Sequence, residues 1–390
     1  MPGRTDAVWD AVIVGSGPAG SATAITLAAY GWHVLMVEKR EARGFKLGES
    51  LPPSSLGLVE HFLGEIGQEQ SAGLFRTAGN ISLWASEQTE IADFFFSSTG
   101  HGLCIDRLAF DDALRAKAVA AGATLLEGVS LRSCARIDNG SAHWRLTFAS
   151  PTGVQQVDAR CLVDCSGRQA VVARALSIPA LHNDDRLFAY AQWFSCSGED
   201  DDRYTRIEAA PHGWWYTNRL PAVDGQTSRR LVVFHSDRDL PAARLAASQQ
   251  GFDELLQDTK HIAPLLKERG YRASAAIRGA PAGSQRLREF CGDVWMAVGD
   301  AAQAYDPLSS QGIDKALKSG SHAGHMIHYA LADDTQSMSA SGSRNAFIDQ
   351  YDEQQRQLWA AYVSQRDFYY RLQPRWLDQP FWQRRVRHTG

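Results

Sequence analysis

Apolar runs that end in glycine-rich turns set the pattern at the start of the chain. Residues 11–14 and 34–37 are short apolar runs of the kind that buried strands have, and the alanine-rich stretch between them is long enough for a helix. A second helix is predicted over residues 105–121, because its apolar side chains fall on one face and Asp106 stands near the N-cap. A strand, a helix and a strand in this order are typical of a parallel sheet with a crossover helix.

The middle of the chain alternates between apolar and polar residues and therefore predicts antiparallel strands. Asp224 and Gly225 supply a turn between the last two of these strands, and the acidic run at residues 199–203 is expected to be a solvated turn. A hairpin is predicted over residues 80–85 and 91–96. The four middle strands are expected over residues 188–195, 204–209, 213–220 and 229–235.

The remaining periodic segments complete the order of the elements. Strands that form a meander are predicted over residues 124–129, 130–138, 142–149 and 154–157, before a buried strand over 161–164. Further elements are a helix over 251–268, a strand over 294–298, a helix over 312–330 and a helical tail over 345–387. The fold class is therefore α/β, with a Rossmann-type dinucleotide-binding domain interrupted by a mainly antiparallel-sheet domain and followed by a helical C-terminal tail.

The first turn carries a dinucleotide fingerprint. Gly15, Gly17 and Gly20 form G-x-G-x-x-G between a predicted strand and a predicted helix, and Glu38 ends the second strand at about the expected spacing of roughly 20 residues. The glycines permit a tight turn, a close approach to a pyrophosphate and close packing of the helix on the sheet. The N-terminus of the helix attracts the phosphates, and Glu38 is placed to accept hydrogen bonds from a ribose. This stretch does not distinguish NAD from FAD.

Composition excludes several classes of protein. A net charge of −4 over 390 residues argues against a nucleic-acid partner. The six cysteines show neither a C-x-x-C pair nor metal-ligand spacing, so reduced thiols and no metal site are expected. No apolar segment approaches the ~20 residues that span a bilayer, and no signal peptide is visible. We therefore expect a cytoplasmic protein without a membrane span.

Four separated motifs resemble those of one family. They are the glycine fingerprint, Asp106-Arg107 at the head of a helix, residues 164–168 at the end of a strand, and residues 298–302 with 306–313. Together they are similar to the flavoprotein monooxygenases of the p-hydroxybenzoate hydroxylase superfamily. The resemblance covers nearly the whole chain and implies FAD as the cofactor.

The resemblance also implies which residues bind FAD. The three glycines would hold the pyrophosphate, Glu38 the adenosine ribose, Arg107 would lie along the phosphates and Asp300 would bond the ribityl chain. The loop at residues 306–313 would bring backbone N–H groups to the flavin, where a helix N-terminus stabilises the anionic reduced form. The expected cofactor-binding residues are Gly15, Gly17, Gly20, Glu38, Arg107, Asp300, Pro307, Gly312 and Ile313.

The order of the predicted elements also gives the domain boundaries. The FAD-binding domain would be discontinuous, and the antiparallel sheet would form the substrate domain. The FAD-binding domain would take residues 1–75, 102–180 and 278–335, the substrate domain 76–101 and 181–277, and the helical C-terminal segment 344–390.

Two further motifs indicate a branch of this superfamily. Residues 48–53 and 213–221, together with the tail, resemble the tryptophan-halogenase-like subgroup. Halogenases use a lysine located some thirty residues after the first motif, but this chain has no lysine between Lys46 and Lys117. The halogenase signature W-x-W-x-I-P is also altered here. The hydroxylases and oxidases of this branch remain, and among them the chain most resembles the flavoproteins that mature tryptophylquinone cofactors by oxygenating a tryptophan of a partner enzyme.

The expected activity is that of an FAD-dependent monooxygenase acting on an electron-rich aromatic substrate through a flavin C4a-hydroperoxide. Trp214 and Tyr216 share one face of a strand and are expected to line the substrate pocket, whereas Trp215 points the other way. Glu49 and His101 are candidates for a catalytic base, with a loop-capping carboxylate and a turn residue as the alternative interpretations.

Several alternatives remain open at this stage. The substrate is a free indole or phenol, or an aromatic group bound to a protein or a carrier. A halogenase-like enzyme, a prenyl or alkene reductase, and a protein that docks a partner through its aromatic and basic tail are the other functions considered. Oxygen is the expected co-substrate. The electrons come from NAD(P)H or from a separate flavin reductase, and the altered turn at Ser166-Gly167 puts direct use of NAD(P)H in doubt.

Overall fold

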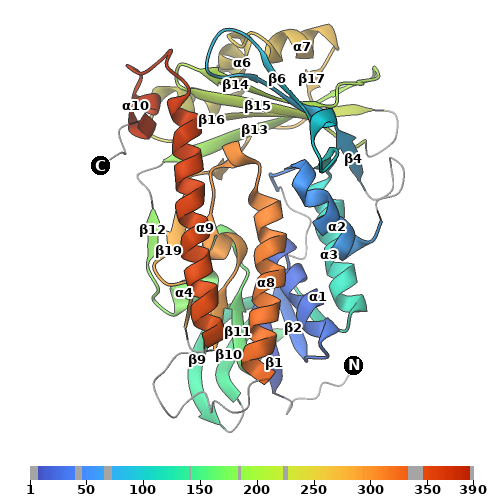
Figure 1. Cartoon of the computed structure of the whole chain (residues 1–390), viewed down its shortest axis with the longest axis vertical. Helices are drawn as coiled ribbons and strands as arrows, with labels where there is room; N and C mark the ends of the chain where they lie inside the picture. The colour runs from blue at the N-terminus through green and yellow to red at the C-terminus, as the bar shows by residue number, and fades with distance from the viewer. Residues whose placement is uncertain are drawn as a thin grey trace.

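The computed structural model describes residues 8–39, 46–65, 73–139, 142–182, 186–222, 227–292, 294–332 and 346–386. Two large sheets lie one above the other in Figure 1, and two long helices, α8 (Gly312–Ala332) and α9 (Ala346–Arg371), run beside the lower sheet toward the upper one. The turn predicted at Asp224 and Gly225 lies outside the described residues.

The lower sheet is mainly parallel and contains the predicted strand–helix–strand unit. β1 (Trp9–Val14) pairs in parallel with β2 (Val34–Glu38) on one side and with β11 (Gly153–Asp164) on the other. Residues 11–13 of β1 are completely buried, as expected for a central strand of a sheet that is covered on both faces. The strand order is β20-β21-β11-β1-β2-β8, with β8 (Thr124–Glu127), β20 (Cys291–Gly292) and β21 (Trp295–Ala297).

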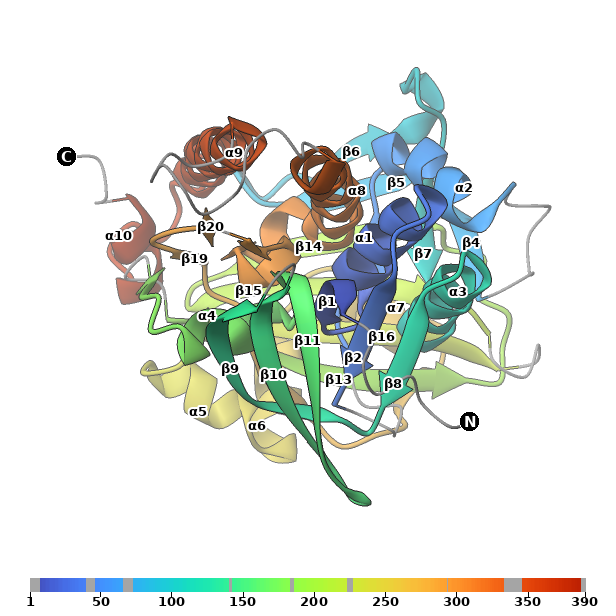
Figure 2. The same cartoon turned by 90° about the horizontal axis from the view of Figure 1, so that it is seen from below.

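Helix α1 (Pro18–Ala29) and helix α8 pack side by side against this sheet (Figure 2). A Cβ atom at Gly320 of α8 would lie only 2.5 Å from the carbonyl oxygen of Ala19, and one at Gly324 would lie 2.6 Å from Thr26 Cβ. The two glycines therefore allow the helices to approach more closely than larger residues would permit.

The predicted meander has three strands instead of four. β10 (Ala142–Ser150) lies between β9 (Ser130–Asn139) and the first half of β11 and pairs antiparallel with both (Figure 2). The prediction was wrong for β8, which pairs in parallel with β2. Residues 154–157 and 161–164 are also one strand, because β11 leaves the meander and continues, fully buried, beside β1.

The upper sheet is mainly antiparallel and contains the four predicted middle strands. Its order is β17-β13-β16-β15-β14-β5-β6, with β18 paired to β13 and with a parallel pair between β14 and β5. The strands are β5 (Gly79–Leu83), β6 (Glu90–Asp93), β13 (Leu187–Cys196), β14 (Tyr204–Ala210), β15 (Gly213–Leu220), β16 (Ser228–Asp237), β17 (Arg272–Ala273) and β18 (Arg278–Pro281).

The helix predicted over residues 251–268 is two helices, α6 (Gln249–Gln257) and α7 (Ile262–Glu268), which lie over the upper sheet after α5 (Pro241–Ala246) (Figure 1). The carboxylate of Glu208, on β14, accepts hydrogen bonds from the backbone N–H groups of Lys260, His261 and Ile262. A new helix N-terminus therefore forms at this point, because a carboxylate from the sheet satisfies its free N–H groups.

The second strand of the predicted hairpin is shorter than expected. β6 ends at Asp93, and residues 94–96 form the 3₁₀ turn η2 (Phe94–Phe96). Asp93 Oδ1 accepts a hydrogen bond of 2.8 Å from the backbone N–H of Phe95. This local cap competes with the strand and ends it.

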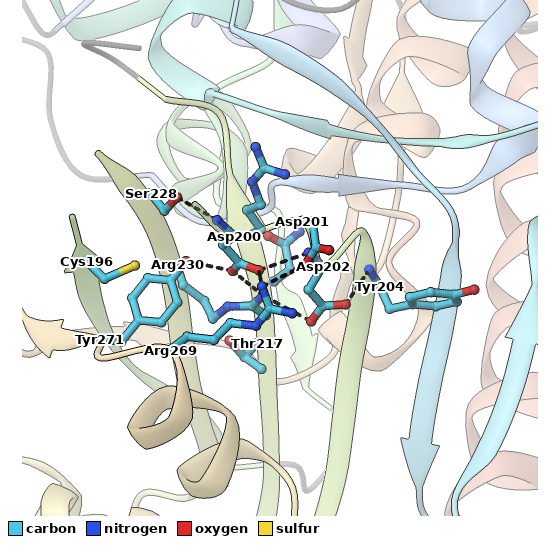
Figure 3. A network of polar contacts seen from close by, with 12 residues as sticks. Cys196, Asp200, Asp201, Asp202, Tyr204, Thr217, Ser228, Arg230, Arg269 and Tyr271 are labelled. Atoms are coloured by element: carbon cyan, nitrogen blue, oxygen red, sulfur yellow. Dashed lines mark hydrogen bonds and ion pairs between the residues drawn. The ribbon is translucent and has the colours of Figure 1, made fainter. Parts of the chain in front are cut away.

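The acidic run at residues 199–203 is only partly the solvated turn that was predicted, because residues 199, 201 and 203 are exposed but the two acids between them are not. Asp200 and Asp202 are buried, and Nη2 of the fully buried Arg230 lies 2.7 Å from Asp200 Oδ2 and 3.1 Å from Asp202 Oδ2 (Figure 3). Asp200 also accepts hydrogen bonds from the Tyr271 hydroxyl at 2.7 Å and from Arg269 at 2.8 Å. The network ties β16 to the segment that leads from α7 into β17.

Two small sheets, short helices and 3₁₀ turns connect these layers. The small sheets are formed by β3 (Ser50–Leu51), β4 (Leu74–Thr77) and β7 (Gly102–Ile105), and by β12 (Ala180–His182), β19 (Gln285–Leu287) and β22 (Gln303–Ala304). The helices and turns are η1 (Pro53–Ser55), α2 (Leu56–Leu63), α3 (Arg107–Ala120), η3 (Gly167–Gln169), α4 (Val171–Ala175), η4 (Gly299–Ala301), η5 (Pro307–Ser309) and α10 (Pro380–Val386).

The predicted fold class is confirmed. A Rossmann-type α/β unit is interrupted by a mainly antiparallel sheet, and the chain ends in the helices α9 and α10. Among the helices that the structure describes, none has the length and apolar character needed to cross a membrane.

Candidate functional site

The glycine turn after β1 is tightly packed at Gly15 and Gly20 and open at Gly17. Gly15 has a φ of 104°, and a Cβ atom there would lie 2.3 Å from the carbonyl oxygen of Cys165. A Cβ atom at Gly20 would lie 2.0 Å from the carbonyl oxygen of Gly15, whereas no atom lies within 4 Å of one built at Gly17. The open space at Gly17 adjoins the N-terminus of α1 at Pro18, so an anionic group such as a pyrophosphate fits there.

Glu38 faces this turn from the end of β2. Its Oε2 atom accepts hydrogen bonds from the backbone N–H of Ser16 at 3.1 Å and from the Ser16 hydroxyl at 3.0 Å. The structure therefore brings together the glycine turn and the acid that the fingerprint pairs with it.

Arg107 begins helix α3, which Asp106 caps by accepting hydrogen bonds from the N–H groups of Leu108 and Ala109. The Arg107 guanidinium lies 3.3 Å from the carboxylate of the buried Asp111 and donates to the carbonyl oxygen of Leu47. Lys46 Nζ lies 2.6 Å from the same carboxylate of Asp111. These contacts hold the loop before β3 against the start of α3.

The N-terminus of α8 meets the same loop. A Cβ atom at Gly48 would lie 3.1 Å from Arg107 Nη1 and 4.0 Å from Ile313 Cδ1, and no atom lies within 4 Å of one built at Gly312. Pro307 begins the turn η5 that leads into this helix. The loop, Arg107 and the first turn of α8 therefore lie close together, and the start of α8, where N–H groups have no partner within the helix, is open at Gly312.

Asp300 lies between the two helix N-termini. It follows Gly299, which has a φ of 64° and whose Cβ atom would lie 2.8 Å from Ala19 of α1. Lys315 Nζ lies 2.7 Å from Asp300 Oδ1, and Arg168 Nε lies 3.9 Å from Asp300 Oδ2. Burial by itself raises the pKa of Asp300, but Lys315 and Arg168 outweigh it, so the pKa is lowered and the carboxylate stays ionised.

Lys315 was not among the residues expected in the site. The signal that could have found it is a lysine at a position that α8 buries, one turn after Gly312. Arg168 belonged to one of the recognised motifs, but its position beside Asp300 was not predicted.

Glu49, the last residue of the loop before β3, is buried and lies near the half-buried Tyr216. Burial raises the pKa of Glu49 to about 7, against the opposing effect of the Arg107 guanidinium. The pKa of Tyr216 is raised well above its ordinary value, first by burial and then by the nearby Glu49. Cys104 also lies near Tyr216, and its thiol donates to the carbonyl oxygen of Arg219 at 3.0 Å. A carboxyl group with a pKa near neutrality can take up and release protons at physiological pH.

His101 is placed away from Glu49. Leu51 pairs with Leu103 and Ser50 with Cys104, so Glu49 lies beside Ile105 at the other end of β7 from His101. Four residues of strand separate His101 from Ile105, a distance of about 13 Å at ~3.3 Å per residue. The His101 side chain is exposed. The two candidate bases are therefore not brought together.

The three aromatic residues of β15 alternate as predicted. Trp214 and Tyr216 face the cluster that contains Tyr370, whereas Trp215 packs against Phe252 on the other face, with the ring centroids 5.1 Å apart. Trp214 is enclosed, since its indole N–H donates to the Tyr370 hydroxyl at 3.1 Å. Its ring also stacks on His235 at 3.7 Å, where burial lowers the pKa of the imidazole to about 3.

Two tyrosines of helix α9 contact the loop at residues 306–313. The Tyr370 hydroxyl donates to Asp306 Oδ2 at 2.7 Å, and the Tyr362 hydroxyl accepts from the Asp306 backbone N–H at 2.7 Å. Sequence reasoning missed this connection, because both tyrosines are distant in the sequence from the loop that they contact.

Comparison with known proteins finds a family and a relative that are both described as FAD-dependent or FAD-binding. The sequence profile of the family described as FAD binding domain matches residues 9–365. The putative FAD-dependent oxidoreductase LodB of Marinomonas mediterranea is 26% identical over 379 residues, which cover 97% of this chain and 96% of that protein.

Two solved structures share the fold. One is described as the peptidyl tryptophan dihydroxylase QhpG, essential for tryptophylquinone cofactor biogenesis; it has 24% identity and a TM-score of 0.67, with 97% of this chain and 79% of that chain covered. The other is the myxobacterial chondrochloren halogenase CndH, with 22% identity, a TM-score of 0.81 and coverage of 97% and 86%. Among the described residues, no group of three or more histidine, cysteine or acidic side chains is placed to hold a metal ion.

Proposed function

The chain belongs to the family described as FAD binding domain and is an FAD-dependent oxidoreductase, and on this premise we propose that it is a monooxygenase of electron-rich aromatic substrates. The observation that carries the proposal is the buried Glu49, whose pKa lies near neutrality beside the loop held by Arg107. When FAD is bound and reduced, it supplies the activation of O2. One oxygen atom enters an aromatic C–H bond and the other leaves as water, with two electrons and two protons consumed.

We propose that the cofactor extends from the glycine turn to the first turn of α8. Gly15, Gly17 and Gly20 would leave room for the pyrophosphate, and Glu38 would accept from the ribose. Arg107 would contribute positive charge beside the phosphates, and Asp300 would accept hydrogen bonds from the ribityl hydroxyls. Pro307, Gly312 and Ile313 would shape the loop whose N–H groups meet the flavin. The open space at Gly17 and at Gly312 supports this path.

Glu49 would act as the base that takes a proton from the substrate. A carboxyl group with a pKa of about 7 is close to half ionised at neutral pH, so it can accept a proton from a phenol or an indole ring and release it in the next cycle. Tyr216 would line the pocket beside Glu49 and exclude water. Trp214, which lies on the same face of β15 and is held by Tyr370, would support Tyr216. His101 is exposed and is left without a role in this step.

The substrate would be an indole or a phenol, including a tryptophan of a partner protein. Similarity in fold to a protein described as a peptidyl tryptophan dihydroxylase supports the last of these. Reducing equivalents would come from NAD(P)H directly or through a separate flavin reductase. We further propose that the lower sheet with α1 and α8 is the FAD-binding domain and that the upper sheet carries the substrate domain.

The test is incorporation of isotopic oxygen. The FAD-loaded protein is supplied with NADH, a flavin reductase and ¹⁸O2, and offered a tryptophan-containing peptide or a substituted phenol; mass spectrometry should find one heavy oxygen atom in the product. Catalase and a reaction without the protein control for hydrogen peroxide. Saturation of an alkene without oxygen, or a halogenated product in the presence of bromide, would contradict the proposal and favour a reductase or a halogenase.

A further inference from the structure

Lys315 is a buried cation that contacts Asp300, a residue of the proposed FAD site. It stands on α8, one turn after the N-terminus, and is about 7% exposed. Its ammonium group lies 2.7 Å from Asp300 Oδ1, donates to the carbonyl oxygen of Gln303 and lies 4.1 Å from the centroid of the Tyr305 ring. An ammonium group has three N–H donors, and these three contacts occupy them.

The partner of Lys315 faces outward. The Asp300 side chain is 35% exposed, and its second carboxylate oxygen lies 3.9 Å from Arg168 Nε, too far for a hydrogen bond. The exposed part of the pair is therefore a carboxylate, and the cation stands behind it. Gly299 permits this arrangement, because a Cβ atom at this position would lie 2.8 Å from Ala19 of α1 and 3.8 Å from Ala316 of α8, so only glycine lets the chain pass between the two helices just before Asp300.

A lone carboxylate at this position would oppose the chemistry of the cofactor. Two-electron reduction makes the flavin anionic, and a nearby negative charge disfavours that form. Lys315 balances the charge of Asp300, so the site keeps the hydrogen-bond acceptor without the electrostatic cost. That the protein binds FAD follows from its family, whereas the position of the flavin beside Asp300 rests on the proposed function.

We propose that Lys315 is a positioning residue that raises the reduction potential of the bound flavin by neutralising Asp300 from behind. Removing the ammonium group should make reduced FAD bind less tightly relative to oxidised FAD. A tenfold change in that ratio of dissociation constants corresponds to about 30 mV for a two-electron couple, and we expect a shift of about this size to more negative potential.

The experiment measures the potential of the FAD-loaded protein by anaerobic reduction against a reference dye. K315M should lower the potential, and K315R should keep it near the wild-type value, because it retains the charge. The matched control is K318M on the same helix, whose ammonium group is largely exposed and pairs with Asp314, and it should leave the potential unchanged. Equal potentials for K315M and the wild type would overturn the proposal.

A second pair of variants covers the case in which K315M does not fold. D300N removes the carboxylate that Lys315 pairs with, so the lysine can be changed in that background without leaving a carboxylate that has lost its closest cation. D300N should raise the potential, and D300N/K315M should return it toward the wild-type value. Coincident potentials for D300N and D300N/K315M would overturn the role of Lys315 while leaving the FAD site intact. A wild-type protein that binds no FAD would instead refute the proposed site, and the role of Lys315 with it.

Discussion

The buried ion pair between Arg230 and Asp200 should contribute strongly to the stability of the upper sheet. Both side chains are completely buried, and Nη2 of Arg230 contacts Asp200 at 2.7 Å and Asp202 at 3.1 Å (Figure 3). Changing Arg230 to Met keeps a long apolar side chain but leaves two carboxylates without their shared cation. The expected result is a marked loss of stability, because an uncompensated buried charge is costly.

The size of this loss of stability depends on the contacts that Asp200 keeps when Arg230 is replaced. Removing one partner of a buried ion pair costs about 3–5 kcal/mol. Asp200 keeps the Arg269 guanidinium at 2.8 Å and the Tyr271 hydroxyl at 2.7 Å. Because these contacts still compensate part of the charge, we expect R230M to lower the free energy of unfolding by about 3 kcal/mol, at the low end of that range.

The pH dependence gives a second signature. Burial by itself raises the pKa of Asp200, but Arg230, Tyr271 and the backbone outweigh it, so the folded-state pKa lies below the ordinary 3.8. A lowered pKa contributes stability that is present above the unfolded-state value and is lost as the pH falls through the folded-state value. In R230M this contribution is reduced, so the deficit relative to the wild type should stay constant from neutrality down to about pH 4 and should shrink as the pH falls further, through the lowered folded-state pKa.

The assay is urea unfolding at saturating FAD, followed by tryptophan fluorescence, with R269M as the matched control. Arg269 binds the same carboxylate but is about 29% exposed, so its removal should cost less than about 1 kcal/mol. D200N/R230M, which removes both charges, should recover part of the loss. A cost for R230M no greater than that for R269M would refute the reasoning that burial decides the strength of this network.

Three further variants test the proposed site. E49Q should lower turnover by about 10²–10⁴-fold and abolish the rise in activity through about pH 7, whereas the control E90Q, at an exposed position, should not; an unchanged pH profile in E49Q would exclude Glu49 as the base. Because the pKa of Glu49 is raised from 4.5 to about 7, this carboxyl group makes the folded state less stable as the pH rises between these two values. E49Q should therefore also be more stable than the wild type above pH 7. Y370F removes the hydroxyl that joins Trp214 to Asp306 and should weaken FAD binding roughly tenfold in a fluorescence titration. The control Y369F, at the neighbouring residue, should not change FAD binding. Equal affinities of the two variants for FAD would contradict a role of α9 in holding the loop at residues 306–313. G15A should abolish copurification of FAD, because its Cβ atom would lie 2.3 Å from the carbonyl oxygen of Cys165. The control G31A should keep its flavin absorbance, because Gly31 also has a positive φ but has open space around its Cβ position. FAD retained by G15A would refute the packing argument.

The sequence by itself determined the features that depend on local chemistry. The first strand, the glycine turn and α1 follow from an apolar run, three glycines and a helix-length alanine-rich stretch that lie next to one another in the chain. Asp106 caps α3 as predicted, because a cap needs only the N–H groups two and three residues away. The alternation of Trp214, Trp215 and Tyr216 also follows from the period of a strand.

Only the tertiary structure decided the features that depend on charges brought from a distance. Residues 251–268 form two helices because Glu208, from another strand, caps the second one. Asp200 and Asp202 of the acidic run are buried because Arg230 reaches them from β16. Likewise, the raised pKa of Glu49 and the pairing of Lys315 with Asp300 result from burial and from neighbours on other elements. Pattern rules describe residues within a few positions of one another, whereas the energy of a buried charge depends on what surrounds it in space.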